Sequence, residues 1–273
     1  MRIAFLGGGN MASALIGGLI AKGTDARSIS VIELSPAARE RLAARYPVHL
    51  ATAPDAATQR SDVLVIAVKP QDMRAALASI QLSNQLVISV AAGIRLEALS
   101  RWLGGHEKLV RCMPNTPALI GAGIAALYAL PKVSASERQS AETILRAVGE
   151  VVWVKDESLL DPVTAVSASG PAYVFWFIEQ LAASAEKLGI EKATAAKLAL
   201  HTVLGSAKLA AQSDSAPAEL RKQVTSRGGT TEAALKVFED EKLAERFVRA
   251  VEAASRRGAQ MGDEFGADEF GKD

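Results

Sequence analysis

The sequence predicts an α/β domain with a doubly wound parallel sheet, followed by an all-α domain. Short apolar segments alternate with helix-patterned segments as far as about Lys155, and this alternation is typical of a parallel sheet. Beyond Lys155 the strand signal stops and only helical patterns follow. We therefore expect domains at residues 1–155 and 156–262, and a disordered tail at 263–273, where the acidic sequence DEFG occurs twice.

The first strand and the turn after it give the strongest local signal. Residues 3–6 (IAFL) form an apolar run, and Gly7, Gly9 and Ala12 then fit the pattern G-x-G-x-x-G/A. Gly7 permits a tight turn, Gly9 lets the backbone approach a phosphate, and Ala12 allows the helix to pack closely on the strand. Free amides at the helix start favour an anion. In this context the segment predicts a Rossmann dinucleotide site rather than an ordinary glycine-rich turn.

The other elements follow in chain order. Apolar runs predict strands at 29–33, 62–68, 85–90, 108–113, 124–128 and 150–154. Ser35 and Pro36 cap the helix after the first of these strands, and a helix at 134–148 precedes the last. In the second domain, helical patterns cover 161–189, 192–212, 216–224, 230–239 and 242–261. These helices are rich in alanine, so we expect them to pack against a second subunit.

Composition narrows the class of protein. A net charge of +1 gives no electrostatic footprint for nucleic acid, and the most apolar segment, 172–178, is too short to cross a bilayer. No secretory signal precedes the first strand, and the single cysteine, Cys112, fits a reducing cytoplasm, where we expect it to be a small buried hydrophobe. His49, His106 and His201 lack metal-ligand spacing, so no metal site is expected. The prediction is a cytoplasmic protein without a nucleic-acid or membrane partner.

Later motifs select among the many dehydrogenases with this domain order. GGGNMA at 7–12 is followed by VKPQ at 68–71, the turn Ala91-Ala92-Gly93, RCMPNTPALIGAG at 111–123, DPVTAVSASGPAY at 161–173 and SRGGTTEAAL at 226–235. Together these resemble pyrroline-5-carboxylate reductase, from Arg2 to about Met261. The resemblance implies NAD(P)H-dependent reduction of 1-pyrroline-5-carboxylate to L-proline. It also implies a homodimer with interlaced helical domains, often assembled into a larger ring, and an active site that draws residues from two chains.

Candidate substrate residues come from the motifs and this resemblance. Glycines at a helix start leave amides free and threonine hydroxyls add donors, so the segment Gly228, Gly229, Thr230 and Thr231 could bind the substrate carboxylate. From the residues alone a plain N-capped helix explains the segment equally well, and the resemblance favours substrate binding. The resemblance also places Ser226, Thr164 and Asp214 near the substrate, and Lys69 near both substrate and nicotinamide, although a solvated lysine is the alternative.

The expected cofactor-binding residues follow the strand ends of the first domain. For Asn115 a purely structural role in its proline-rich turn is an equal alternative. The full set is Gly7, Gly8, Gly9, Asn10, Met11, Ser35, Val68, Lys69, Pro70, Ala91, Ala92, Gly93 and Asn115.

Two positions depart from the family pattern. Arg227 stands where the family usually has a proline, which puts a cation near the anion site or in solvent. At the end of the second strand, many relatives have an arginine near the serine that receives the 2′-phosphate, whereas this chain has Glu33-Leu34-Ser35. An acidic residue here is the usual ribose ligand of NAD enzymes, while Ser35 and Arg39 could still hold a phosphate. The resemblance implies NADP(H), with NAD(H) as a second donor, and the preference stays open.

Two other functions remain to be separated from this one. A β-hydroxyacid dehydrogenase-like oxidoreductase shares the glycine turn and a helical second domain, but it needs a lysine on the helix after its glycine-serine motif, and residues 167–180 contain none. A non-catalytic NADPH-sensing protein would not need the GGTT segment. An assay of NAD(P)H oxidation with pyrroline-5-carboxylate separates the three functions.

Overall fold

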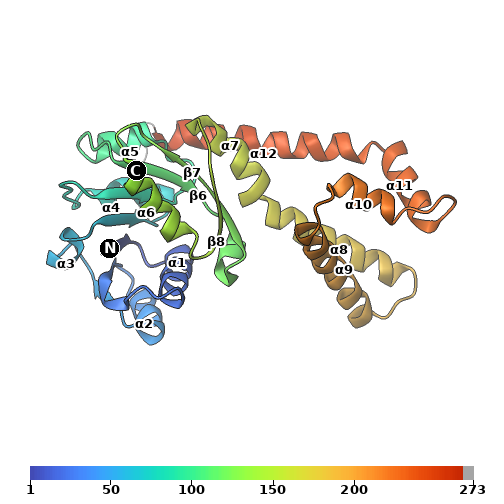
Figure 1. Cartoon of the computed structure of the whole chain (residues 1–273), viewed down its shortest axis with the longest axis horizontal. Helices are drawn as coiled ribbons and strands as arrows, with labels where there is room; N and C mark the ends of the chain where they lie inside the picture. Colours follow the sequence, from blue (N-terminus) through green and yellow to red (C-terminus); the bar gives the residue numbers. More distant parts are fainter. Residues whose placement is uncertain (267–273) are drawn as a thin grey trace. The chain divides into compact units, whose positions relative to one another are not determined.

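The computed structural model describes residues 1–266, which form two compact units (Figure 1). The sheet unit contains Met1–Ser169 and the segment from Ala253 onward, and the helical unit is Gly170–Glu252. The helical unit is therefore an insertion in the chain of the sheet unit. The sequence places the domain boundary at residue 155. In the structure, residues 156–169 and the last part of the final helix, from Ala253, belong to the sheet unit instead.

Within residues 1–266, eight strands form one sheet in the order β3-β2-β1-β4-β5-β6-β7-β8. Neighbouring strands are parallel except for β6 and β7, which are antiparallel, so the sheet is predominantly rather than wholly parallel. The strands are β1 (Ile3–Leu6), β2 (Ile29–Ile32), β3 (His49–Ala51), β4 (Val63–Ile66), β5 (Leu86–Ser89), β6 (Leu109–Met113), β7 (Gly123–Ala129) and β8 (Gly149–Trp153).

Helices cover both faces of this sheet, as a doubly wound fold requires. Successive residues of a strand point to opposite faces, so Phe5 belongs to one apolar cluster and Leu6 to the other. The first cluster takes residues from α1 (Asn10–Ala21), α2 (Pro36–Arg45) and α6 (Ala135–Leu145), and the second from α4 (Met73–Leu77) and α5 (Leu96–Trp102). The remaining helices of this part are α3 (Ala56–Gln59) and α7 (Leu160–Val163).

The helical unit is made of five helices in the described part of the chain. They are α8 (Gly170–Lys187), α9 (Lys192–Gln212), α10 (Pro217–Gln223), α11 (Thr230–Asp240) and the first part of α12 (Leu243–Gly266). Among its described residues, Ala195 and Ala199 are the buried apolar ones, whereas Phe175 and Trp176 are 65% and 56% exposed. A unit without large buried side chains has little core of its own. None of the helices within residues 1–266 is long and apolar enough to cross a membrane.

The segment expected as one helix at 161–189 is divided in the structure. A π-helix, Thr164–Ala168, separates α7 from α8, and Ser169 N–H donates to Thr164 O at 2.9 Å. Pro171 has no N–H, so the carbonyl of Ser167 cannot form its helical hydrogen bond. Asn115 Nδ2 donates to that carbonyl instead, at 3.1 Å. The break therefore has an identifiable cause in the sequence.

The last described residues are helical, which differs from the sequence prediction, whereas the cysteine is buried as predicted. The tail was expected from residue 263, but α12 continues to Gly266, and residues 267–273 lie outside the described part. Asp263 accepts a hydrogen bond from Arg95 Nη2 at 3.0 Å, which ties this last turn to the sheet unit. Cys112 is fully buried in β6, as expected, and burial raises the pKa of its thiol.

Candidate functional site

The candidate cofactor residues of the sheet unit follow the carboxyl ends of neighbouring strands in the middle of the sheet. Gly7, Val68 and Ala91 come after β1, β4 and β5, which lie side by side. Because β2 and β4 flank β1, the chain changes direction across the sheet at this point. Ligands of open α/β sheets bind at such a switch point, beyond the carboxyl ends of the strands.

The glycine turn leaves space and free amides at the start of α1. Gly7 has φ +94°, and a Cβ there would lie 2.9 Å from Ala67 O, so only glycine fits. Gly9 is the N-cap of α1, no side chain caps the helix, and a Cβ on Gly9 would meet no atom within 4 Å. The amides of Asn10 and Met11 belong to the first helical turn, and the N–H groups of this turn have no hydrogen-bond partner inside the helix. The residues therefore fit a pyrophosphate.

A carboxylate braces this turn, which the sequence did not reveal. Gly8 N–H donates to Glu33 Oε2 at 2.7 Å, and Ser35 N–H donates to Glu33 Oε1, also at 2.7 Å. The Nη1 of Arg39 donates to the backbone carbonyls of Glu33 and Leu34, at 2.8 Å each. The loop after β2 is thus held between the glycine turn and α2.

The next two strand ends offer a lysine and a small-residue turn. Lys69 is the N-cap of the 3₁₀ turn Pro70–Asp72 and is exposed, and its side chain forms no hydrogen bond or ion pair with other described residues. In the turn Ala91-Ala92-Gly93, a Cβ on Gly93 would lie 2.8 Å from Phe265 Cδ2. The last turn of α12 therefore packs directly against the turn after β5.

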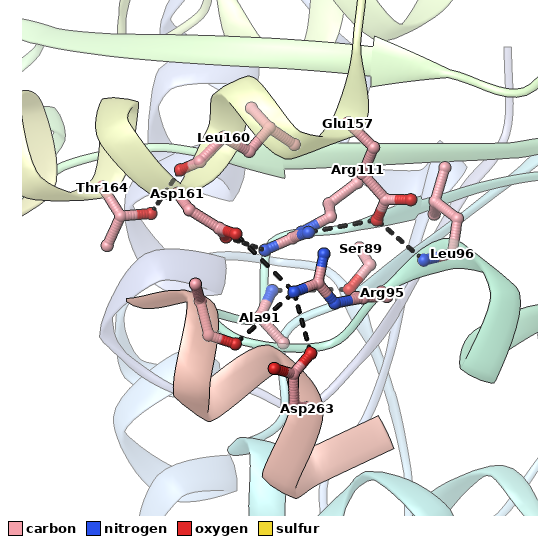
Figure 2. Close-up of polar contacts among 11 residues, drawn as sticks. Ser89, Ala91, Arg95, Leu96, Arg111, Glu157, Leu160, Asp161, Thr164 and Asp263 are labelled. Atoms are coloured by element: carbon pink, nitrogen blue, oxygen red, sulfur yellow. Dashed lines mark hydrogen bonds and ion pairs between the residues drawn. The ribbon is translucent and has the colours of Figure 1, made fainter. Parts of the chain in front are cut away.

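Beside this turn lies a buried ionic cluster, which Figure 2 shows. Arg111 of β6 is 2% exposed, and its Nη1 donates to Glu157 Oε1 at 3.0 Å. The same carboxylate oxygen accepts from Leu96 N–H at 2.8 Å. Arg111 Nη2 lies 3.5 Å from Asp161 Oδ1, and Arg95 Nη2 lies 3.8 Å from Asp161 Oδ2. The cluster joins β6, the start of α5 and α7.

Thr164 lies on the π-helix that follows α7, and Asn115, in the turn after β6, bonds to the same π-helix. The hydroxyl of Thr164 donates to Leu160 O at 2.7 Å, so its proton is committed and its oxygen can only accept a further hydrogen bond (Figure 2). The amide of Asn115 has two partners, since Nδ2 donates to Ser167 O and Oδ1 accepts from Ile124 N–H at 3.0 Å. Both polar atoms of the Asn115 side chain thus have partners within the protein.

The candidate substrate residues of the helical unit lie in two loops. Gly229 is the N-cap of α11, again without a side-chain cap. Gly228 N–H donates to Glu232 Oε2 at 2.6 Å and Gly229 N–H to Ser226 O at 3.0 Å, so these two amides are already used. The first-turn amides and hydroxyls of Thr230 and Thr231 remain available.

Three further residues in these loops are exposed to solvent. Ser226 and Arg227 are exposed in the loop before α11, and Asp214 is exposed in the loop between α9 and α10. The carboxyl ends of the strands and the α11 loop thus each present candidate residues, and each belongs to its own unit.

Two family models match the chain. The one described as pyrroline-5-carboxylate reductase dimerisation matches residues 157–261, and the one described as NADP oxidoreductase, coenzyme F420-dependent, matches residues 2–93. The first covers the helices from the end of the sheet to α12, and the second covers the glycine turn through the Ala91-Ala92-Gly93 turn.

Curated and solved relatives match nearly the whole chain. Pyrroline-5-carboxylate reductase of Pseudomonas aeruginosa is 44% identical over 268 residues, which is 97% of this chain and 98% of the relative. The solved pyrroline-5-carboxylate reductase of Coxiella burnetii has a TM-score of 0.90 and 39% identity, and covers 95% of this chain and 98% of its own. The Plasmodium falciparum pyrroline carboxylate reductase with NADP bound has a TM-score of 0.83 and 28% identity, with 96% and 98% covered.

Proposed function

The chain belongs to the pyrroline-5-carboxylate reductase family, and on that premise we propose how its residues carry out the reaction. It is an oxidoreductase that uses NAD(P)H to reduce 1-pyrroline-5-carboxylate to L-proline, the last step of proline biosynthesis. Curated relatives that match nearly the whole chain have this activity. They therefore do not favour the two alternatives, a β-hydroxyacid dehydrogenase and a non-catalytic NADPH sensor.

The glycine turn holds the pyrophosphate of the cofactor in this proposal. Gly9 leaves open space above the uncapped start of α1, and the amides of Asn10 and Met11, with the positive end of the helix dipole, bind the anion there. Val68, Pro70 and the turn Ala91-Ala92-Gly93 line the nicotinamide end. When bound, the reduced nicotinamide supplies a hydride.

The substrate carboxylate binds at the start of α11. Thr230 and Thr231 supply amides and hydroxyls, while Gly228 and Gly229 shape the turn because their own amides are used within the protein. Ser226, also accessible, adds a hydroxyl. A carboxylate at a helix N-terminus is stabilised by the dipole as well as by these donors.

The protonated imine needs acceptors rather than an acid. Thr164 has committed its proton to Leu160 O, so its oxygen can accept from the ring N–H and hold the imine in its protonated form. Asp214 is an exposed carboxylate that complements the same positive charge, and Lys69 is a free donor for a carboxylate or carbonyl. Orientation then supplies most of the rate enhancement, because the protonated imine is already electrophilic.

The proposal includes assembly and location. Exposed Phe175 and Trp176 on α8 support a homodimer through the helical unit. We propose that such dimers assemble further into a larger ring. A free, buried Cys112 as the single cysteine supports a cytoplasmic location. Light scattering of the purified chain measures the first of these directly, and a monomer at micromolar concentration would contradict it.

The activity is tested by following NAD(P)H oxidation at 340 nm with 1-pyrroline-5-carboxylate and by detecting proline as the product. We expect turnover with this substrate and none with a β-hydroxyacid and the oxidised cofactor. The reverse result would reject the function.

The carboxylate site is tested with Thr231→Ala. A hydrogen bond to a charged group contributes about 1.5 to 3 kcal/mol, so the KM for the substrate should rise roughly tenfold or more, with cofactor affinity unchanged. Thr225→Ala is the matched control, because that hydroxyl donates to Arg221 O in the same loop. Equal effects of the two changes would move the carboxylate site elsewhere.

A further inference from the structure

We propose that the loop after β2 selects a cofactor without a 2′-phosphate, so that this reductase binds NAD(H) more tightly than NADP(H). The inference rests on the proposed function, since it takes the glycine turn as the pyrophosphate site. It concerns four neighbouring residues, Glu33, Leu34, Ser35 and Arg39, whose contacts decide which charge the loop accepts.

Glu33 presents a fixed negative charge beside the glycine turn. Its two carboxylate oxygens each accept one backbone N–H, from Gly8 and from Ser35, at 2.7 Å. Each oxygen keeps a further lone pair, so the carboxylate can accept a hydrogen bond from a ribose hydroxyl. A phosphate in the same place has no proton to donate and carries a charge of about −2.

No cation in the described part of the chain neutralises this carboxylate. Arg39 is the nearest candidate on α2, but its Nη1 donates to two backbone carbonyls of the loop, and the ion pairs within residues 1–266 do not include Glu33. Leu34, at the tip of the loop, is 75% exposed. The loop therefore exposes a large apolar side chain, where a phosphate would need a positive charge.

The start of α2 also offers few donors for a phosphate. Pro36, at the first helical position, has no N–H. Ser35 N–H is used by Glu33, and Ala38 N–H donates to Ser35 Oγ at 3.3 Å. The anion site that a helix N-terminus normally provides is thus largely occupied by the protein itself. With a carboxylate in place and donors missing, the loop favours a free 2′-hydroxyl.

The test measures binding without turnover. NAD⁺ and NADP⁺ are titrated by calorimetry into the wild type, Glu33→Gln and Leu34→Arg, with melting curves to confirm folding. The controls are Glu40→Gln, which removes an exposed carboxylate from the neighbouring helix α2, and Leu34→Ala. Like-charge contacts discriminate strongly between partners, so we expect the wild type to bind NAD⁺ roughly tenfold or more tightly than NADP⁺. Both test variants should reduce that ratio roughly tenfold, and both controls should leave it unchanged.

Three results would overturn the inference. The first is a wild type that binds NADP⁺ as tightly as NAD⁺ or more tightly. The second is an unchanged ratio in folded Glu33→Gln or, should that variant unfold, in Leu34→Arg, whose exposed position tolerates a charge. The third comes from the same titration of one more variant, Arg39→Ala: a selective loss of NADP⁺ binding there would make Arg39 the phosphate ligand. If the wild type binds neither nucleotide, the glycine turn is not the cofactor site and the proposed function fails with it.

Discussion

Replacing Arg111 with methionine tests whether the buried ionic cluster holds α7 on the sheet. The Arg111 side chain is 3% exposed, and its partners Glu157 and Asp161 are 20% and 9% exposed. Removing one partner of a buried pair typically costs about 3 to 5 kcal/mol, because the other charge stays buried without its counterion. Glu157 keeps its bond from Leu96 N–H and Asp161 keeps Arg95 at 3.8 Å, so we expect the low end, about 3 kcal/mol.

The assay is thermal unfolding followed by circular dichroism at fixed protein concentration. At about 2 to 4 °C per kcal/mol for a protein of this size, Arg111→Met should lower Tm by roughly 6 to 12 °C. Arg146→Met is the control, because Arg146 is 46% exposed and pairs with Glu142 and Glu150 on the surface. Exposed pairs contribute about 0 to 1 kcal/mol.

A double-mutant cycle separates loss of the pair from loss of packing. In the Arg111→Met background, Asp161→Asn should cost less than it does in the wild type, because the charge that it removes has already lost its main counterion. If the two substitutions are additive, or if Arg111→Met and Arg146→Met lower Tm equally, the cluster does not stabilise the packing of α7 on the sheet.

Three further predictions follow from single residues. Gly9→Ala should leave Tm unchanged, because its Cβ meets no atom within 4 Å, yet weaken dinucleotide binding roughly tenfold or more; normal binding by calorimetry would remove the pyrophosphate from this turn. The N–H of Thr58, and then His49, lowers the pKa of Asp55 to about 2, so its stabilising effect is complete above the unfolded value of about 4 and is lost as the pH falls toward 2. Asp55→Asn should therefore lower stability to urea modestly at pH 7, and the difference from the wild type should shrink below pH 4; a constant difference would contradict this. Burial raises the pKa of the Cys112 thiol, so a thiol reagent should react with the protein only after denaturation, and rapid reaction of the native protein would show that β6 opens.

Much of the sheet could be predicted because buried parallel strands are continuous apolar runs. β1, β4 and β5 have every residue buried, and their runs stand out between polar turns. β3 was missed because it is a three-residue strand at the edge of the sheet, beginning with the exposed His49. Its pairing with β2 comes from the tertiary fold, and a segment this short has no period to detect.

The candidate site was predicted unevenly, for a different reason. The glycine turn is a local motif, so residues 7–12 were readable from their spacing alone. The bracing of Gly8 by Glu33 joins residues 25 apart, and the donation from Asn115 to Ser167 O joins residues 52 apart. Sequence shows that Pro171 leaves a carbonyl without its donor, but only the fold shows which side chain replaces that donor. The Arg111 cluster, which joins three separate segments, was not foreseen.

The insertion of the helical unit within the sheet unit has a consequence for biosynthesis. Arg95 bonds to Asp263 across 168 residues, and Phe265 packs against Gly93, so the sheet unit gains these contacts only after the helical unit between them has been translated. While residues 170–252 are being translated, the turn after β5 lacks its contact with α12. Contacts so distant in sequence also close slowly. A nascent chain stalled before residue 253 should therefore bind dinucleotides weakly. Synthesis of α12 should then be the step that allows full dinucleotide binding.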